Sequence, residues 1–93
     1  MEPVEIQITD VLDLHIFRPD EIEDLLLNYL DECIARGLFS VRIIHGKGKG
    51  ILKRKVCGIL KKHPKVKSFK NAPIEFGGWG ATIAELYHKT PAK

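Results

Sequence analysis

The clearest periodic pattern of apolar and polar positions in the chain predicts a helix from Pro19 to Arg36. Seven apolar side chains recur at i, i+3, i+4 and i+7 and so share one helical face. These are Ile22, Leu25, Leu26, Tyr29, Leu30, Cys33 and Ile34. Proline suits the first helical position, the acidic residues after it favour the positive end of the helix, and Gly37 suits its C-terminal end.

Four short segments have the pattern of β-strands. Residues 11–15 alternate, so that Leu12 and Leu14 should face one way and Asp13 and His15 the other. Residues 38–44 include a β-branched apolar run typical of a buried strand, and residues 65–69 and 81–87 complete the set. A second helix is predicted from about Gly50 to Lys62. It should bury four apolar side chains, those of Leu52, Val56, Ile59 and Leu60.

The predicted order is therefore β-α-β-α-β-β. A right-handed βαβ crossover makes the first two strands parallel, and their carboxyl ends then lie at the same edge of the sheet. Ligands of open α/β sheets tend to bind at such an edge. If these strands are neighbours, Asp13, His15 and His45 converge there.

The segment after the second strand is rich in glycine and lysine. Gly46, Gly48 and Gly50 alternate with Lys47 and Lys49, and the second helix follows. Glycine allows positive φ angles and lets backbone amides approach a ligand, while a helix N-terminus favours anions. The lysines add positive charge. This segment is predicted to bind phosphate, the alternative being a plain tight turn.

Composition and charge favour one small domain that binds a polyanion. A chain of 93 residues has room for a single core. We expect an N-terminal arm at 1–10, the domain at 11–88 and a tail at 89–93. Residues 1–40 carry ten acidic and two basic side chains, whereas residues 41–93 carry thirteen basic and two acidic ones. From Arg42 to Lys70 there are eleven bases and no acid, which indicates a nucleic-acid-binding face or, alternatively, solvated surface charge.

Several classes of protein are disfavoured by the sequence. No apolar run approaches the ~18 residues of a membrane span, and the acidic N-terminus differs from a secretory signal, so a cytoplasmic location is expected. Cys33 and Cys57 are expected to be buried reduced thiols, and no cysteine–histidine spacing suggests zinc. The glycine loop lacks the Gly-Lys-Ser/Thr of triphosphate-binding loops. His63 and His88 have no chemical context and are expected to be exposed.

Three segments, taken together, resemble the small MutS-related (Smr) domain family. They are Leu12-Asp13-Leu14-His15, His45-Gly46-Lys47-Gly48-Lys49-Gly50 and Gly77-Gly78-Trp79-Gly80-Ala81-Thr82. The resemblance implies a two-layer α/β sandwich with a mixed four-stranded sheet and two helices, similar to the C-terminal domain of a bacterial translation initiation factor. It also implies a free-standing relative of the C-terminal domain of MutS paralogues, with nucleic-acid binding and nicking endonuclease activity on DNA or RNA. Ile16 departs from the glycine that commonly follows the first-motif histidine.

The resemblance and the residue chemistry together assign candidate roles. The candidate catalytic residues are Asp13, His15 and His45: His15 as general base, Asp13 to orient it or hold a cation, and His45 to protonate the leaving group. The candidate nucleic-acid-binding residues are Gly46, Lys47, Gly48, Lys49, Gly50, Lys53, Arg54, Lys55, Gly78 and Trp79. Trp79 is expected either to stack on a base or to anchor its loop. No cofactor is required, although hydrolysis of DNA favours a divalent cation such as Mg²⁺ or Mn²⁺.

Three hypotheses follow from the sequence. The first is an endonuclease that cleaves DNA or RNA phosphodiesters. The second is a non-catalytic module that binds nucleic acid or the ribosome, in which the Asp-x-His sequence of strand 1 merely ties down a neighbouring loop. The third is a domain that binds a small nucleotide or another protein.

Overall fold

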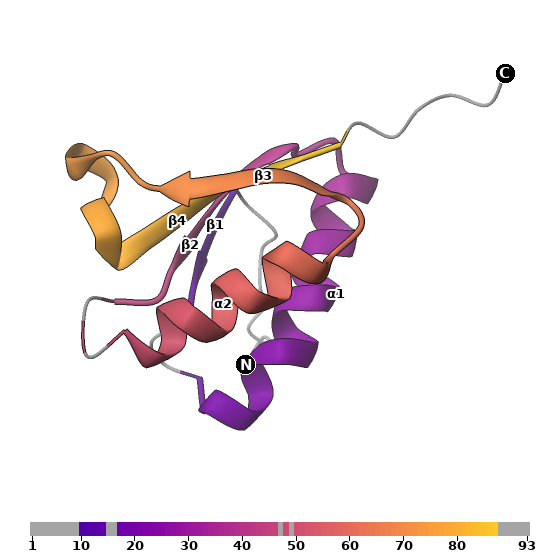
Figure 1. Ribbon diagram of the computed structural model, residues 1–93. Helices are drawn as coiled ribbons and strands as arrows, with labels where there is room; N and C mark the ends of the chain where they lie inside the picture. The colour runs from indigo at the N-terminus through magenta and orange to yellow at the C-terminus, as the bar shows by residue number, and fades with distance from the viewer. Residues whose placement is uncertain (1–9, 15–16, 47, 49, 88–93) are drawn as a thin grey trace, which may run out of the picture.

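The computed structural model describes residues 10–14, 17–46, 48 and 50–87, and its elements follow the predicted order (Figure 1). The four strands are β1 (Val11–Asp13), β2 (Ser40–Ile44), β3 (Val66–Asn71) and β4 (Ala81–Leu86). The two helices are α1 (Ile22–Ala35) and α2 (Ile51–Lys62). Short 3₁₀ turns precede α1 at Pro19–Glu21 and occupy the predicted loop before β4, at Ile74–Phe76 and Gly78–Gly80.

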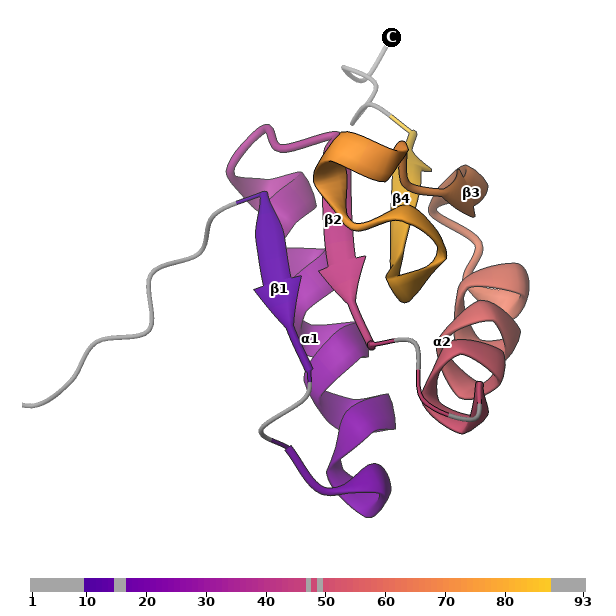
Figure 2. The ribbon, with the colours of Figure 1, turned by 90° about the vertical axis from the view of Figure 1, so that its left-hand side faces the viewer.

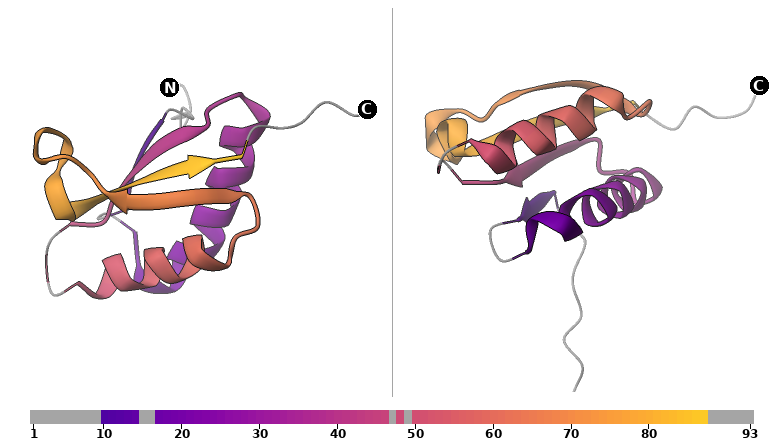
Figure 3. Two further views of the ribbon diagram at one scale, coloured as in Figure 1. Left: turned by 45° about the horizontal axis from the view of Figure 1, so that its top comes forward. Right: turned by 60° about the horizontal axis from the view of Figure 1, so that its bottom comes forward.

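The sheet has the order β1-β2-β4-β3, with β1 parallel to β2 and the other pairs antiparallel. This confirms the mixed four-stranded sheet and the parallel first pair. The last strand, β4, lies between β2 and β3 and is hydrogen-bonded to both. Both helices cover the same face of the sheet, α1 near β1 and β2 and α2 near β4 and β3 (Figures 1 and 2). The domain therefore has two layers, which the tilted views show edge-on (Figure 3).

The core lies between the sheet and the two helices. The apolar face predicted for the first helix is confirmed, since six of its seven side chains are buried and Leu25 packs partly buried against them. From α2, Val56 and Leu60 are buried, while Leu52 and Ile59 lie half-buried at the edge of the core. Both cysteines are free thiols; Cys33 is buried as expected, but Cys57 is only half-buried. Within the described ranges, no helix is long and apolar enough to span a bilayer.

The prediction that His63 is exposed is wrong. Its side chain is only 7% exposed, and its Nε2 lies 3.9 Å from the carboxylate Oδ1 of Asp31 on α1. Its Nδ1 accepts a hydrogen bond from the backbone N–H of Lys65 at 3.0 Å. The turn at Pro64 that ends α2 directs the ring back against α1, and residue type alone did not indicate this contact. His88 lies outside the described residues.

The burial pattern predicts which apolar side chains carry stability. Leu26 is fully buried, whereas Ile74 is 91% exposed. Leu26→Ala should lower the free energy of unfolding by about 2–5 kcal/mol, because it leaves a cavity in the core. Ile74→Ala should change it by less than about 0.5 kcal/mol. Urea unfolding monitored by circular dichroism measures both, and similar losses in the two variants would contradict the assigned core.

Candidate functional site

The carboxyl ends of β1 and β2 lie side by side, as the topology predicted. Asp13 is paired in register with Ile44, and the N–H of Leu14 donates to the carbonyl of Ile44 at 2.8 Å. Strand alternation sets the direction of each side chain. Leu14 is buried beneath the sheet, so Asp13, half-buried, belongs to the opposite, open face. His15 and Ile16, which follow, lie outside the described residues.

His45 points to the helix-covered side of the sheet and is only 4% exposed. Its Nδ1 lies 3.1 Å from the carbonyl oxygen of Gly46, and its Nε2 lies 2.8 Å from the hydroxyl of Thr82 on β4. A carbonyl oxygen can only accept, so Nδ1 carries the proton and Nε2 accepts from the Thr82 hydroxyl. Both ring nitrogens are thus engaged within the protein. Asp13 and His45 therefore lie at neighbouring strand ends but on opposite faces of the sheet, Asp13 on the open face and His45 on the helix-covered face.

The carbonyl of Gly80 joins the second and third motif segments. It accepts hydrogen bonds from the N–H of His45 at 3.1 Å and from the N–H of Gly46 at 2.8 Å. Together with the His45–Thr82 bond, these contacts fasten the end of β2 to the start of β4. The N–H of Gly46 is therefore directed at the protein, and a ligand would have to use amides further along the loop.

The glycine loop leads directly into the N-terminus of α2. Gly46 and Gly50 have φ angles of 83° and 80°, which favour glycine because other residues rarely adopt this conformation. Gly50 is the N-cap of α2 and has no side chain to cap the helix. The first amides of any α-helix lack partners within the helix, so this end is electropositive. Gly48 is exposed beside it, while Lys47 and Lys49 lie outside the described residues.

Lys53 and Trp79 connect α2 to the turn before β4. The Nζ of Lys53 lies 4.4 Å from the centroid of the Trp79 ring, a cation–π arrangement. The ring is nevertheless 48% exposed, and Gly78 beside it is half-buried. The contact places the ring against Lys53 and leaves part of the ring open to solvent, so both roles expected for Trp79 stay predictions. Arg54 and Lys55 are exposed one and two positions further along the helix.

The electrostatic surroundings keep His45 neutral. Burial lowers its pKa below the usual value, and the nearby positive charge of Lys53 lowers it further; the hydrogen bond to the Gly46 carbonyl opposes them in part. Neutrality agrees with the hydrogen-bonding pattern, in which one ring nitrogen donates and the other accepts. Within the ranges that the structure describes, no three histidine, cysteine or carboxylate side chains group in a way that could hold a metal ion.

The roles of Gly80 and Thr82 were not predicted from the residues themselves. Their only sequence signal was membership of the third segment, Gly77 to Thr82, which entered through the family resemblance. Their contacts with His45 join positions more than thirty residues apart along the chain. Local patterns of hydrophobicity or turn chemistry contain no information about such a contact.

Comparisons with known proteins agree with this geometry. The arrangement defines a two-layer α/β domain with a glycine loop at the end of a parallel strand pair. The chain belongs to the Smr domain family, whose profile matches residues 12–87.

Similar proteins come from several bacteria. The chain is 48% identical over 75 residues to Endonuclease MutS2 of Helicobacter pylori, which covers 81% of this chain and 10% of that protein. It is 44% identical over 75 residues to Endonuclease MutS2 of Lactococcus lactis. The chain thus spans about a tenth of the length of these curated relatives.

Two solved structures share the fold. The Smr domain of Thermus thermophilus MutS2 has a TM-score of 0.78 and 34% identity, covering 83% of this chain and 96% of that one. The stand-alone small MutS-related protein YdaL of Escherichia coli has a TM-score of 0.80 and 28% identity, covering 86% of this chain and 65% of that one.

The hydrogen bond between His45 and Thr82 predicts a stability difference between two similar substitutions. Thr82→Val removes the hydroxyl and leaves the buried Nε2 of His45 without a donor, so the free energy of unfolding should fall by about 1–3 kcal/mol. Thr82→Ser keeps the hydroxyl and should lose less. Urea unfolding at neutral pH measures both variants. Equal losses would show that the hydroxyl does not stabilise the folded chain.

The lowered pKa of His45 predicts a loss of stability in acid. The unfolded imidazole takes up a proton near its usual pKa of 6.5, whereas the folded one resists protonation to lower pH. The contribution of the neutral His45 to the free energy of unfolding should be fully present above that pH. Below it, this contribution should fall by up to about 1.4 kcal/mol per pH unit, until the folded imidazole also takes up a proton. Urea unfolding between pH about 7.5 and about 5.5 should show a steeper loss for wild type than for His45→Asn. Parallel losses would contradict this origin.

Proposed function

We propose that this Smr domain binds the sugar–phosphate backbone of DNA or RNA at the glycine loop and cleaves a phosphodiester bond there. The observation that carries the proposal is the glycine loop itself, held at the electropositive end of α2 by the carbonyl of Gly80. The relatives named Endonuclease MutS2 support the reaction class.

The binding half of the site would consist of loop amides and nearby cations. Gly48 and Gly50 precede the helix, and their lack of side chains allows a phosphate to approach the backbone. Lys47 and Lys49 would add charge, an assignment that rests on the sequence. Lys53 stands over the Trp79 ring at the start of α2, where its ammonium group and the exposed part of the ring would face the same bound strand.

The reactive half would lie at the end of β1. Asp13 occupies the open face at that strand end, and His15 follows it two positions later. In the proposed reaction His15 removes a proton from the attacking water or ribose hydroxyl, and Asp13 orients the imidazole. The attacking oxygen forms a bond to phosphorus, the bond from phosphorus to the leaving ester oxygen breaks, and that oxygen takes a proton from solvent water. The loop amides and Lys47 stabilise the negative charge that develops on the phosphate. Because β1 and β2 are parallel neighbours, both halves stand at the same edge of the sheet.

We assign His45 a positioning role rather than the general-acid role expected from the sequence. A general acid must present a proton to the leaving oxygen. The one ring proton of His45 is directed at the Gly46 carbonyl, and the ring is buried. Through its bonds to Gly46 and Thr82, the ring would instead hold the start of the glycine loop in place.

Binding without cleavage is the second candidate function. The specific observation in its favour is the engagement of both His45 nitrogens, which leaves His15 as the one remaining imidazole of the proposed site. In that case the domain would bind nucleic acid in a strongly salt-dependent manner and show no turnover.

A cleavage assay separates these two functions. Supercoiled plasmid and structured RNA are incubated with wild type, Asp13→Asn and His15→Ala, each with and without a chelator. His15→Ala removes the general base and should reduce the cleavage rate by about 10²–10⁴-fold, and Asp13→Asn should also reduce it. Glu32→Gln is the matched control, because its exposed carboxylate pairs with Arg36 in the last turn of α1, at the other end of that helix from the strand end that carries Asp13. The same residual activity in all four proteins would rule out catalysis by this site.

A further inference from the structure

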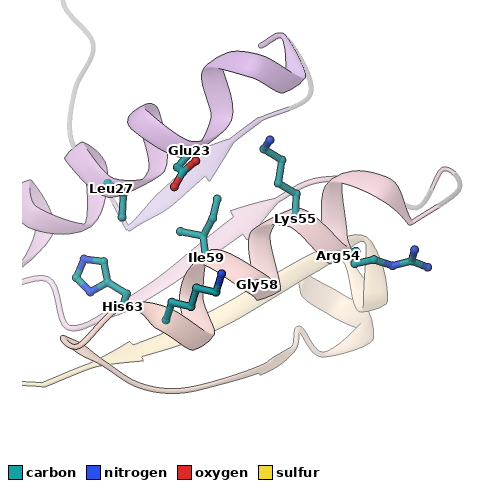
Figure 4. A pocket seen from close by; sticks show the side chains of 8 residues that line it. Glu23, Leu27, Arg54, Lys55, Gly58, Ile59 and His63 are labelled. Carbon is teal, nitrogen blue, oxygen red and sulfur yellow. The ribbon is translucent and has the colours of Figure 1, made fainter.

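A groove between α1 and α2 begins beside the site described above, at Arg54 and Lys55, and continues along α2 away from the glycine loop (Figure 4). One wall comes from Glu23 and Leu27 of α1, and the floor comes from α2. Most of its polar lining is basic and comes from α2 and the residue after it: Arg54, Lys55, Lys62 and His63. In Figure 4, Lys55 and Arg54 stand toward the N-terminal end of α2 and His63 toward the other end. The groove therefore runs along α2, the helix that follows the glycine loop.

The positive charge of this groove is largely uncompensated. Arg54, Lys55 and Lys62 are exposed, and none of the three forms an ion pair within the described part of the chain. Glu23 is the one carboxylate among the lining residues. Three cations beside a concave surface concentrate a positive potential that attracts polyanions. His63 differs from them, because its Nε2 faces Asp31.

Gly58 lies in the middle of this groove, inside a helix where glycine is unfavourable. A Cβ atom at this position would meet nothing within 4 Å, and φ is not positive there. Neither packing nor backbone conformation therefore requires glycine. A glycine inside a helix that neither packing nor backbone conformation requires indicates a functional role for the position. The missing side chain leaves the helix backbone accessible between two cations.

The spacing of the cations suits an extended ligand. Arg54, Gly58 and Lys62 are four residues apart and share one stripe of α2. Arg54 and Lys62 are thus about 12 Å apart along the helix axis, from a rise of ~1.5 Å per residue. A single phosphate cannot reach both. Leu27 and Ile59, both half-buried, add an apolar wall against which sugar carbons can pack.

We propose that the α1–α2 groove, centred on Gly58 and flanked by Arg54 and Lys62, is a second binding site for the nucleic-acid backbone. It takes the strand beyond the segment bound at the glycine loop, and so extends the contact from the N-terminus of α2 to its C-terminus. This inference rests on the proposed nucleic-acid function. Nucleic acid is favoured over an acidic polypeptide because the groove is continuous, along one helix, with the glycine loop.

The test compares binding by a long and a short ligand. Fluorescence anisotropy measures the Kd of a labelled duplex of about 20 base pairs and of a labelled trinucleotide, over a range of salt concentrations. For the duplex, Lys62→Ala should raise Kd about threefold and reduce the slope of log K against log salt by about 0.9. The trinucleotide occupies only the glycine loop, so its Kd for Lys62→Ala should equal its Kd for wild type. Lys67→Ala, an exposed lysine on β3, is the matched control and should leave duplex binding unchanged.

Variants at Gly58 test the groove without loss of charge. Gly58→Ala and Gly58→Gln should each raise Tm by about 4–8 °C, because both residues are better helix formers than glycine and the position is open. Gly58→Gln should nevertheless weaken duplex binding, since its longer side chain occupies the groove. Increased stability with weaker binding cannot result from misfolding.

Four results would overturn the groove assignment. The first is duplex binding by Lys62→Ala and Gly58→Gln that equals wild type, while wild type itself binds. The second is an equal loss in Lys62→Ala and Lys67→Ala, which would indicate only net charge. The third is a poly-glutamate ligand that depends on Lys62 when the duplex does not, which would indicate an acidic polypeptide partner. The fourth is a wild type that binds no nucleic acid, and this alone would remove the proposed function as well.

Discussion

The site depends on one backbone carbonyl, that of Gly80, which accepts hydrogen bonds from the N–H groups of both His45 and Gly46. The buried His45 ring adds a third bond across the same junction, to Thr82. These contacts hold the end of β2 against the start of β4 and so determine where the glycine loop begins. Because the loop leads directly into α2, the position of the helix N-terminus follows from the same junction. A buried polar network of this kind stabilises one geometry only when every member has its partner, and the tautomer of His45 meets that condition.

The helix α2 then connects two surfaces of different chemistry. Its N-terminus stands at the glycine loop, where backbone amides and the Lys53–Trp79 pair meet. Its exposed side runs along the α1–α2 groove, where Arg54 and Lys62 flank Gly58. The opposite side packs Val56 and Leu60 into the core, which keeps both surfaces in a constant relation to the sheet. The division of charge along the chain is reflected in the fold. Most acidic side chains precede β2, whereas α2 carries five basic ones.

Sequence patterns predicted the parts of the fold that depend on local order. The periodicity of the first helix, its end at Gly37 and the parallel first strand pair are all confirmed, because each follows from neighbouring residues or from crossover handedness. The insertion of β4 between β2 and β3 was not predicted, since strand pairing depends on contacts distant in sequence. For the same reason the roles of Gly80 and Thr82 and the contact of His63 with Asp31 could not be read from residue type. The roles of Asp13 and His15 stay predictions.

Binding of nucleic acid at the glycine loop is tested by an NMR titration of the ¹⁵N-labelled protein with a short DNA duplex, which reports on each backbone amide separately. We expect the largest shift changes at Gly48, Gly50 and Ile51, and smaller ones along α2 as far as Lys62. The depression on the open face that Arg42, Phe76 and Ile83 line, away from the strand end that carries Asp13, should change little. Changes confined to that depression, with the glycine-loop amides unaffected, would contradict binding at the glycine loop.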